Sequence, residues 1–212
     1  DVPDLDLSHP WDIPVDDAVR LAIACEDAAR GADPRIVNSE GASFGTTAGL
    51  AVYGNSHGFV GGYPSTRHEL SCAVVAKEGD SMQRDYWWTT ARAPQDLESA
   101  ETVGRRAAER TVGRLNAQRL GTCEVPVLFR ADVAMGLLRS FAGAISGGNL
   151  YRQTSFLLDK LGEQLFPSFV RIYEDPHRLR GLASAPFDGD GVATTPKDLV
   201  TDGVLKSWLL DH

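Results

Sequence analysis

A two-residue alternation along residues 68–77 is the sequence feature that most constrains the fold. His68, Leu70, Cys72, Val74 and Ala76 occupy one set of positions, and a more polar set alternates with them. Such a period of two is typical of a strand with one buried face. Turn signals recur nearby at Asn38 to Gly45, Gly54-Asn55, Gly61-Gly62 and Glu78 to Asp80, so we expect an antiparallel sheet of short strands.

Two helices are predicted to cover this sheet. Residues 15–33 read as a helix with Asp16 and Asp17 in the first turn and Gly31 at the end. A longer helix rich in Ala, Glu and Arg is expected from Pro94 or Leu97 to Arg119. The predicted class is therefore α+β, an antiparallel sheet packed with helices, with a domain boundary near residue 120 that separates residues 1–120 from residues 121–212.

The second half should open with a strand and a buried helix. We predict a strand over Val125–Phe129 and a helix from Ala131 or Asp132 to Ser146-Gly147-Gly148. Apolar residues recur at every fourth position of this helix and should be buried, namely Val133, Leu137, Phe141 and Ile145. A second helical piece is expected from about Ser155, and a strand within residues 168–175.

The chain is then predicted to end in a mixed, β-rich region. A long loop should follow the strand, with a hairpin around Asp202-Gly203. Trp208, Leu209 and Leu210 have no evident partner, so we expect an exposed apolar edge and a tendency to self-associate.

Composition excludes several classes of partner and compartment. The formal net charge of −8 argues against binding to nucleic acid or acidic lipid. No apolar run approaches the roughly 20 residues that span a bilayer, and no signal segment opens the chain. Three widely spaced cysteines suggest reduced thiols, hence a cytoplasmic protein. Because Asp1 stands first, without Met, we expect an excerpt of a longer protein.

Three short motifs carry weaker chemical signals. Gly41-Ala-Ser43-Phe-Gly45 matches G-x-S-x-G, but a nucleophile elbow needs a following helix, so a glycine-rich hairpin turn is favoured. His68 and Cys72 have zinc-helix spacing, but in a strand they would lie about 13 Å apart, too far to share one ion. Residues 188–191 (DGDG) lack the spacing and terminal Glu of a calcium loop and favour a tight polar turn.

Several stretches together resemble the TldD/PmbA family, formerly described as modulators of DNA gyrase, and specifically its PmbA (TldE) branch. They are PDLDLSHPWD, VNSEGASFG, Ser65 to His68, GDSMQRDYWW, VPVLF, FAGAISGGNLYRQTSFLLDKLGEQLFP and EDPHRLRGLASAPFDGDGVAT. The family protein is about twice this long. The resemblance therefore implies a central excerpt, with the end of an N-terminal domain in residues 1–120 and the start of a C-terminal domain in residues 121–212.

The resemblance also implies a specific departure from zinc chemistry. The TldD branch carries H-E-x-x-x-H on the helix after the strand. Alignment through the Leu137-Leu138 pair places Arg139 at the first histidine, Ser140 at the glutamate and Ala144 at the second histidine. We therefore expect no catalytic residue, metal ligand or cofactor in this chain. It resembles the non-catalytic subunit of a heterodimer whose TldD-type partner holds the zinc and which trims small or unfolded peptides.

Two alternatives remain open from the sequence. One is a self-sufficient metallopeptidase that draws ligands from His57, His68 or His177 and from residues outside this chain. The other is a non-enzymatic interaction or regulatory module, such as a modulator of DNA gyrase.

Overall fold

The computed structural model describes residues 2–210 and divides into two compact units. The first unit comprises Asp1–Leu120 and Arg178–Pro186, and the second comprises Gly121–His177 and Phe187–His212. Each unit combines helices with a three-stranded antiparallel sheet, which confirms the α+β class. Within residues 2–210, no helix has both the length and the apolar character needed to span a membrane.

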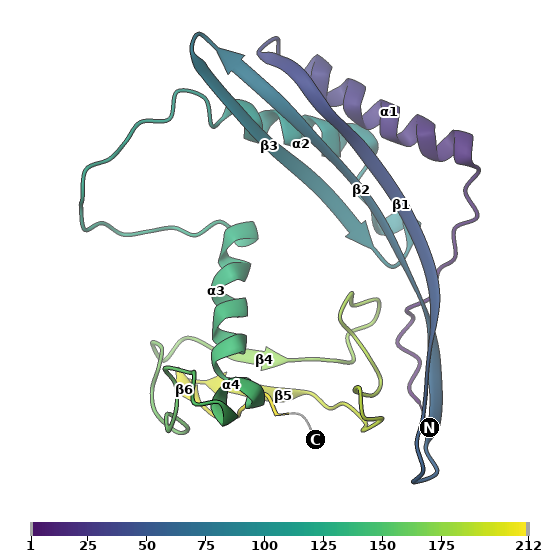
Figure 1. Ribbon diagram of the computed structural model, residues 1–212, viewed down its shortest axis with the longest axis vertical. Helices are drawn as coiled ribbons and strands as arrows, with labels where there is room; N and C mark the ends of the chain where they lie inside the picture. Colours follow the sequence, from purple (N-terminus) through teal and green to yellow (C-terminus); the bar gives the residue numbers. More distant parts are fainter. Residues whose placement is uncertain (1, 211–212) are drawn as a thin grey trace. The chain divides into compact units, whose positions relative to one another are not determined.

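The first unit is built on the strands β1 (Ile36–Gly54), β2 (Val60–Glu78) and β3 (Ser81–Ala91), which follow one another in the sheet (Figure 1). On β2, each of four alternating apolar residues is at most 3% exposed, namely Leu70, Cys72, Val74 and Ala76. The residues between them are half-buried or exposed. The period of two therefore correctly predicted a strand with one face in the core.

Two of the four predicted turns are present. Residues 55–59 join β1 to β2, and Gly79-Asp80 joins β2 to β3. The turns predicted at residues 38–45 and at residues 61–62 are wrong, since both segments lie within strands. Gly41 instead follows a register shift with φ of +103°, and a Cβ on Gly62 would lie 2.8 Å from the Ala51 carbonyl oxygen. These glycines permit an irregular backbone and a close approach between strands.

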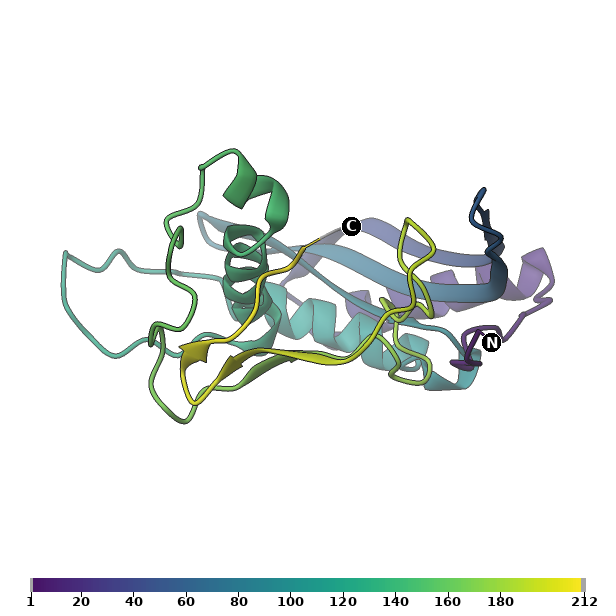
Figure 2. The same ribbon diagram turned by 90° about the horizontal axis from the view of Figure 1, so that it is seen from below.

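The helices α1 (Val15–Ala32) and α2 (Ala100–Val112) cover one face of this sheet (Figures 1 and 2). The core between helices and sheet includes Cys25, Cys72, Val74, Val103 and Ala107. At Gly104 the two helices meet backbone to backbone, because an added Cβ would lie 2.9 Å from the Ala29 nitrogen and closer still to the Cys25 carbonyl oxygen. This contact sets the spacing of the two helices.

The helix predicted from Pro94 or Leu97 to Arg119 is wrong at both ends. Pro94–Asp96 forms a separate 3-10 turn, η1, and α2 begins only after Ser99, whose hydroxyl accepts a hydrogen bond from the Thr102 backbone nitrogen at 3.2 Å. Gly113 caps the end of α2. A side-chain cap and a terminal glycine thus override the general helix propensity of the flanking residues.

The second unit contains α3 (Ala131–Ala144), α4 (Gly147–Tyr151) and the strands β4 (Ile172–Glu174), β5 (Lys197–Thr201) and β6 (Val204–Leu205). The hairpin predicted at Asp202-Gly203 is confirmed, and both residues have the positive φ that such turns require. The strand predicted within residues 168–175 is present as the shorter β4. The core of this unit includes Phe141, Ile145, Leu157, Val200 and Leu205.

Other predictions for this unit are wrong. Residues 125–129 form no strand. On the α3 face expected to be buried, Phe141 and Ile145 are in the core but Val133 and Leu137 are more than half exposed. The helical piece expected from Ser155 is replaced by turns, because the Ser155 hydroxyl donates to the Ala144 carbonyl and accepts from the Leu157 backbone nitrogen.

The C-terminal segment is not left without a partner. The Leu209 backbone nitrogen donates to the Ile145 carbonyl at 2.9 Å, and the Leu209 carbonyl accepts from Gly147 at 2.7 Å. Trp208 and Leu209 pack against the second core, and only Leu210 is largely exposed. The expectation of an unpaired apolar tail at these residues is therefore wrong for Trp208 and Leu209.

Candidate functional site

The helix α3 carries the three positions at which the family resemblance places a zinc motif. Arg139 and Ser140 are exposed on its surface, whereas Ala144 is 8% exposed and belongs to the second core. The Ser140 hydroxyl donates a hydrogen bond to the Gly136 carbonyl at 3.0 Å, back along the helix. The three positions thus have different surroundings as well as different chemistry.

These side chains do not fit a zinc site. Zinc in proteins takes neutral imidazole, thiolate or carboxylate ligands. Arg139 offers only donors on a permanent cation, Ala144 offers a methyl group, and the Ser140 hydroxyl is bonded to its own helix. In the part of the chain that the structure describes, no three or more His, Cys, Asp and Glu side chains are grouped so that they could hold a metal ion.

The three histidines that are alternative candidates for zinc ligands lie in separate environments. His57 is exposed in the turn between β1 and β2, and His68 is fully buried in the middle of β2. The nine residues of strand from Val60 to His68 make eight steps and span about 26 Å, so the structure does not bring these two histidines together. In the second unit, the His177 Nε2 lies 3.0 Å from the Thr194 hydroxyl.

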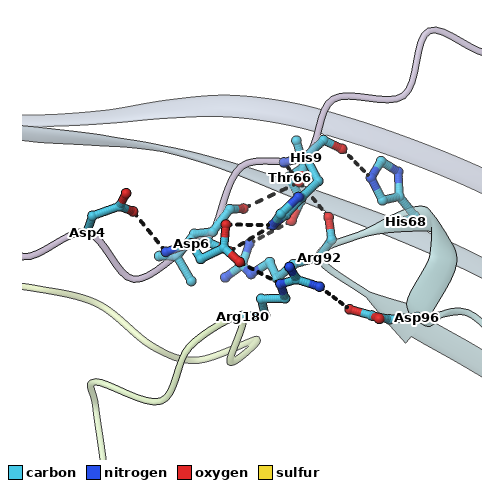
Figure 3. A network of polar contacts seen from close by, with 9 residues as sticks. Asp4, Asp6, His9, Thr66, His68, Arg92, Asp96 and Arg180 are labelled. Carbon is cyan, nitrogen blue, oxygen red and sulfur yellow. Dashed lines mark hydrogen bonds and ion pairs between the residues drawn. The ribbon is translucent and has the colours of Figure 1, made fainter.

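His68 belongs to a polar network in the first unit (Figure 3). Its Nε2 lies 3.0 Å from the His9 carbonyl oxygen, which can only accept, so this nitrogen carries the proton. Its Nδ1 lies 2.8 Å from the Thr46 hydroxyl, a hydrogen-bonding distance. The Trp11 ring packs edge-on against it, with centroids 5.6 Å apart. The buried histidine therefore links β1, β2 and the N-terminal segment.

Thr66 fastens the same segment two residues away on β2. Its backbone nitrogen donates to the Leu7 carbonyl at 2.9 Å, and its hydroxyl accepts from the His9 backbone nitrogen at 2.9 Å. The same hydroxyl donates to the Arg92 carbonyl at 2.7 Å. Residues 7–9 are thus held along β2 by backbone and side-chain hydrogen bonds together.

Two arginines attach residues 178–186 to this network. The Arg92 guanidinium donates to the Thr66 carbonyl at 2.9 Å and to the Leu182 carbonyl at 2.8 Å, and its partial burial lowers its pKa. Arg180 donates to Asp6 at 2.6 Å and reaches Asp96 at 3.4 Å. The hydrogen bond between Arg180 and Asp6 lowers the pKa of the carboxyl and raises the pKa of the guanidinium.

A cavity of about 350 Å³ adjoins this network. It is lined by residues 2–8, Gly62, Tyr63, Pro64 and Pro186. This volume is at the lower end of the range for small-ligand sites. Asp4 and Asp6 give the wall an acidic character, although Asp6 is already paired with Arg180 and the Asp4 carboxylate accepts from the Asp6 backbone nitrogen. The network mainly orders chain segments, and its polar groups are largely satisfied by one another.

Sequence reasoning did not identify this network as a site. Its members come from four separate segments, and no spacing rule relates Asp6, Thr66, Arg92 and Arg180. The sequence indicated these residues only indirectly, through the family resemblance. Three of the stretches on which the family resemblance depends contain Asp6, His68 and Arg180, respectively.

Family models match nearly the whole chain. Residues 8–115 match the central domain of the PmbA/TldA metallopeptidases, and residues 122–212 match their C-terminal domain. The chain is 50% identical over 210 residues to metalloprotease PmbA of Escherichia coli O157:H7, and equally to a PmbA homolog of Haemophilus influenzae. In both cases the match covers 99% of this chain and 47% of the relative, so the chain spans about half the length of these relatives.

Solved structures share the fold. A Bacteroides thetaiotaomicron protein that carries the name modulator of DNA gyrase superposes with a TM-score of 0.92 at 28% identity, over 99% of this chain and 48% of its own. TldE from Thermococcus kodakarensis gives a TM-score of 0.73 at 21% identity, over 94% of this chain and 45% of its own, and supports the fold alone.

Proposed function

The chain belongs to the PmbA/TldD family of metallopeptidases, and from this premise we propose that it is part of a non-catalytic, PmbA/TldE-type subunit. In this proposal a TldD-type partner holds the zinc and performs the hydrolysis. The substrates are small or unfolded peptides that the two subunits process together. The proposal extends to the whole protein, of which the matched relatives have about twice the length of this chain.

The observation that carries the proposal is the chemistry of α3. The relatives are named metalloproteases, yet the three α3 positions discussed above hold a guanidinium, a hydroxyl and a methyl group. None of these can act as an imidazole ligand or as a carboxylate base at neutral pH. A partner that supplies the zinc site reconciles the family name with this helix.

The cysteines support a cytoplasmic location for such a complex. Cys25 and Cys72 are buried free thiols, and Cys123 is an exposed free thiol. Unpaired cysteines are the usual state in a reducing compartment.

The proposal is tested by metal content and peptidase activity. The full-length protein should contain no stoichiometric zinc and should not cleave unstructured peptides alone, but should restore cleavage when mixed with a TldD-type subunit. A partner with its own zinc motif substituted serves as the control and should abolish cleavage. Stoichiometric zinc together with cleavage by the protein alone would contradict the proposal.

The self-sufficient alternative has its own discriminating variants. His57→Ala and His177→Ala alter histidines outside the buried cores, so both variants should fold. If the full-length protein cleaves peptides alone and either substitution removes that activity, the ligands lie in this chain and the subunit proposal is wrong.

A further inference from the structure

Two buried thiols of the first unit lie against one another. Cys25, on the inner side of α1, is 0% exposed, and Cys72, in the middle of β2, is 1% exposed. Both belong to the core between the helices and the sheet, and their side chains share a hydrogen bond. Both are free thiols. The fold thus brings a sulfur atom of a helix into contact with a sulfur atom of a strand, although the two cysteines are far apart in the chain.

The attachment of α1 to the sheet determines how a small solute reaches this pair. The helix spans Val15–Ala32, but its buried residues are only Cys25 and Ala29. Both side chains are small, and an element that buries few apolar contacts opens locally at a low cost in free energy. We expect such openings of α1 to expose both thiols together to small solutes.

The hydrogen bond between the two thiols makes them unequal. It raises the pKa of Cys25, with burial adding to the rise, and it lowers the pKa of Cys72 because the Cys25 thiol stabilises a Cys72 thiolate. The negative charges of Glu101 and Glu26 raise the pKa of Cys25 further. Since the thiolate is the reactive form of cysteine, Cys72 is the residue that an oxidant attacks first.

We propose that Cys25 and Cys72 form a redox-sensitive pair, which hydrogen peroxide converts into a disulfide between α1 and β2. The Cys72 thiolate attacks one peroxide oxygen, which gives a sulfenic acid at Cys72 and releases hydroxide. The Cys25 thiol then attacks the Cys72 sulfur, and the hydroxyl group leaves as water together with the thiol proton. In total, two thiols and one peroxide give one disulfide and two molecules of water, and two electrons pass from sulfur to oxygen.

The disulfide would fasten a helix that the core holds through small side chains. It replaces a contact between two thiols by a covalent link from α1 to β2 and closes a loop of roughly 50 residues. Because the link prevents α1 from leaving the sheet, the oxidised protein should open less often at this helix. A dithiol reductant reverses the reaction by thiol–disulfide exchange. This inference does not rest on the subunit role proposed above.

Peptide mapping of the full-length protein tests the pairing directly. Trypsin cuts after Lys and Arg, so each cysteine of this chain falls in a short peptide of its own, residues 21–30, 68–77 and 120–130. After treatment with hydrogen peroxide and blocking of free thiols, the peptides that contain Cys25 and Cys72 should be recovered joined. Dithiothreitol added before blocking should return them as separate peptides. The exposed Cys123 is the internal control and should be joined to neither.

Two variants at Cys25 test the order of the steps. Cys25→Ser cannot form the disulfide but keeps a hydroxyl that can donate to a Cys72 thiolate, so peroxide should leave a sulfenic acid at Cys72 that dimedone traps. Cys25→Ala lacks this donor, and labelling of Cys72 should be at least about threefold slower in it than in Cys25→Ser. The matched control Cys123→Ala should still form the disulfide between Cys25 and Cys72.

Backbone hydrogen exchange measures the effect of the disulfide on α1. In the peroxide-treated native protein, the amides of α1 should exchange at least about tenfold more slowly than in the reduced protein. Those of α3, and those of α1 in peroxide-treated Cys25→Ser, should be unchanged. Joined peptides that form only in denaturing urea, sulfinic acid at Cys72 in place of a disulfide, or equally fast exchange of α1 in both states would each overturn the proposal. So would the absence of joined peptides in a protein whose Cys123 has been oxidised.

Discussion

Gly104 provides a sharp test of how the two helices of the first unit are packed. In the interior of a helix, replacing Gly by Ala ordinarily raises stability by about 1 kcal/mol. Here the new Cβ would lie 2.9 Å from the Ala29 nitrogen, 3.1 Å from the Ala28 Cβ and closer still to the Cys25 carbonyl oxygen. Two of these neighbours are backbone atoms of α1, so the clash cannot be relieved by a side-chain rotation and the helix must shift.

The magnitude follows from two opposing effects. Overpacking of a well-filled core costs about 1–3 kcal/mol, and displacement of backbone places this site at the upper end of that range or beyond it. After the gain in helix propensity is subtracted, we expect Gly104→Ala to lower the free energy of unfolding by about 2 kcal/mol or more. Gly104→Ala should therefore destabilise the protein, whereas the same substitution at an ordinary helical glycine stabilises it.

Urea unfolding followed by tryptophan fluorescence measures this change. Three of the four tryptophans, Trp11, Trp87 and Trp88, lie in the first unit, so the signal reports mainly on that unit. Gly31→Ala is the matched control, because Gly31 lies in the last turn of α1, its φ is not positive, and a Cβ added to it would meet no atom within 4 Å. The packing argument is refuted if Gly104→Ala is as stable as Gly31→Ala.

Two further predictions concern buried and paired polar groups of the first unit. His68→Leu should lower the free energy of unfolding by about 2 kcal/mol, because the Thr46 hydroxyl and the His9 carbonyl lose their partner. In this variant, backbone hydrogen exchange should become faster at residues 7–9. Unchanged exchange there would contradict the role given to the His68 ring. The hydrogen bond from Arg35 lowers the pKa of Asp33 from 3.8 to about 2, so its stabilisation is complete above pH 3.8 and is lost as the pH falls toward 2. Asp33→Asn should therefore be less stable than the native chain at pH 6, and the difference should shrink as the pH falls and vanish below pH 2. A pH-independent difference would refute this assignment.

The sequence predicted those elements whose signals are local. The alternation on β2 and the hairpin at Asp202-Gly203 depend on neighbouring residues alone, and both are present. Glycine was ambiguous, because a turn and a close approach between strands require the same residue. Which use applies at Gly41 and Gly62 depends on the partner strand, which the local sequence does not specify.

Other features depend on contacts that no sequence spacing records. Residues 125–129 have strand propensity, but no neighbouring strand pairs with them among the described residues, so the propensity is not realised. The network around His68 joins segments up to 174 residues apart, as in the pair of Asp6 and Arg180. No local pattern of residue types relates positions so far apart in the chain.

The different environments along α3 predict what restoring the zinc motif would do. Arg139→His and Ser140→Glu change exposed side chains, so their effect on stability should stay within about 0.5 kcal/mol. Ala144→His would place a large polar ring beside Phe141 and Ile145 in the second core, at a cost of about 2 kcal/mol or more. The triple variant should therefore be less stable than the double variant, bind zinc weakly and show no peptidase activity. Isothermal titration with zinc and thermal unfolding of both variants measure these effects. Stoichiometric, tight zinc binding by the triple variant without loss of stability would show that α3 still presents a metal site, and the proposed non-catalytic role would lose its main support.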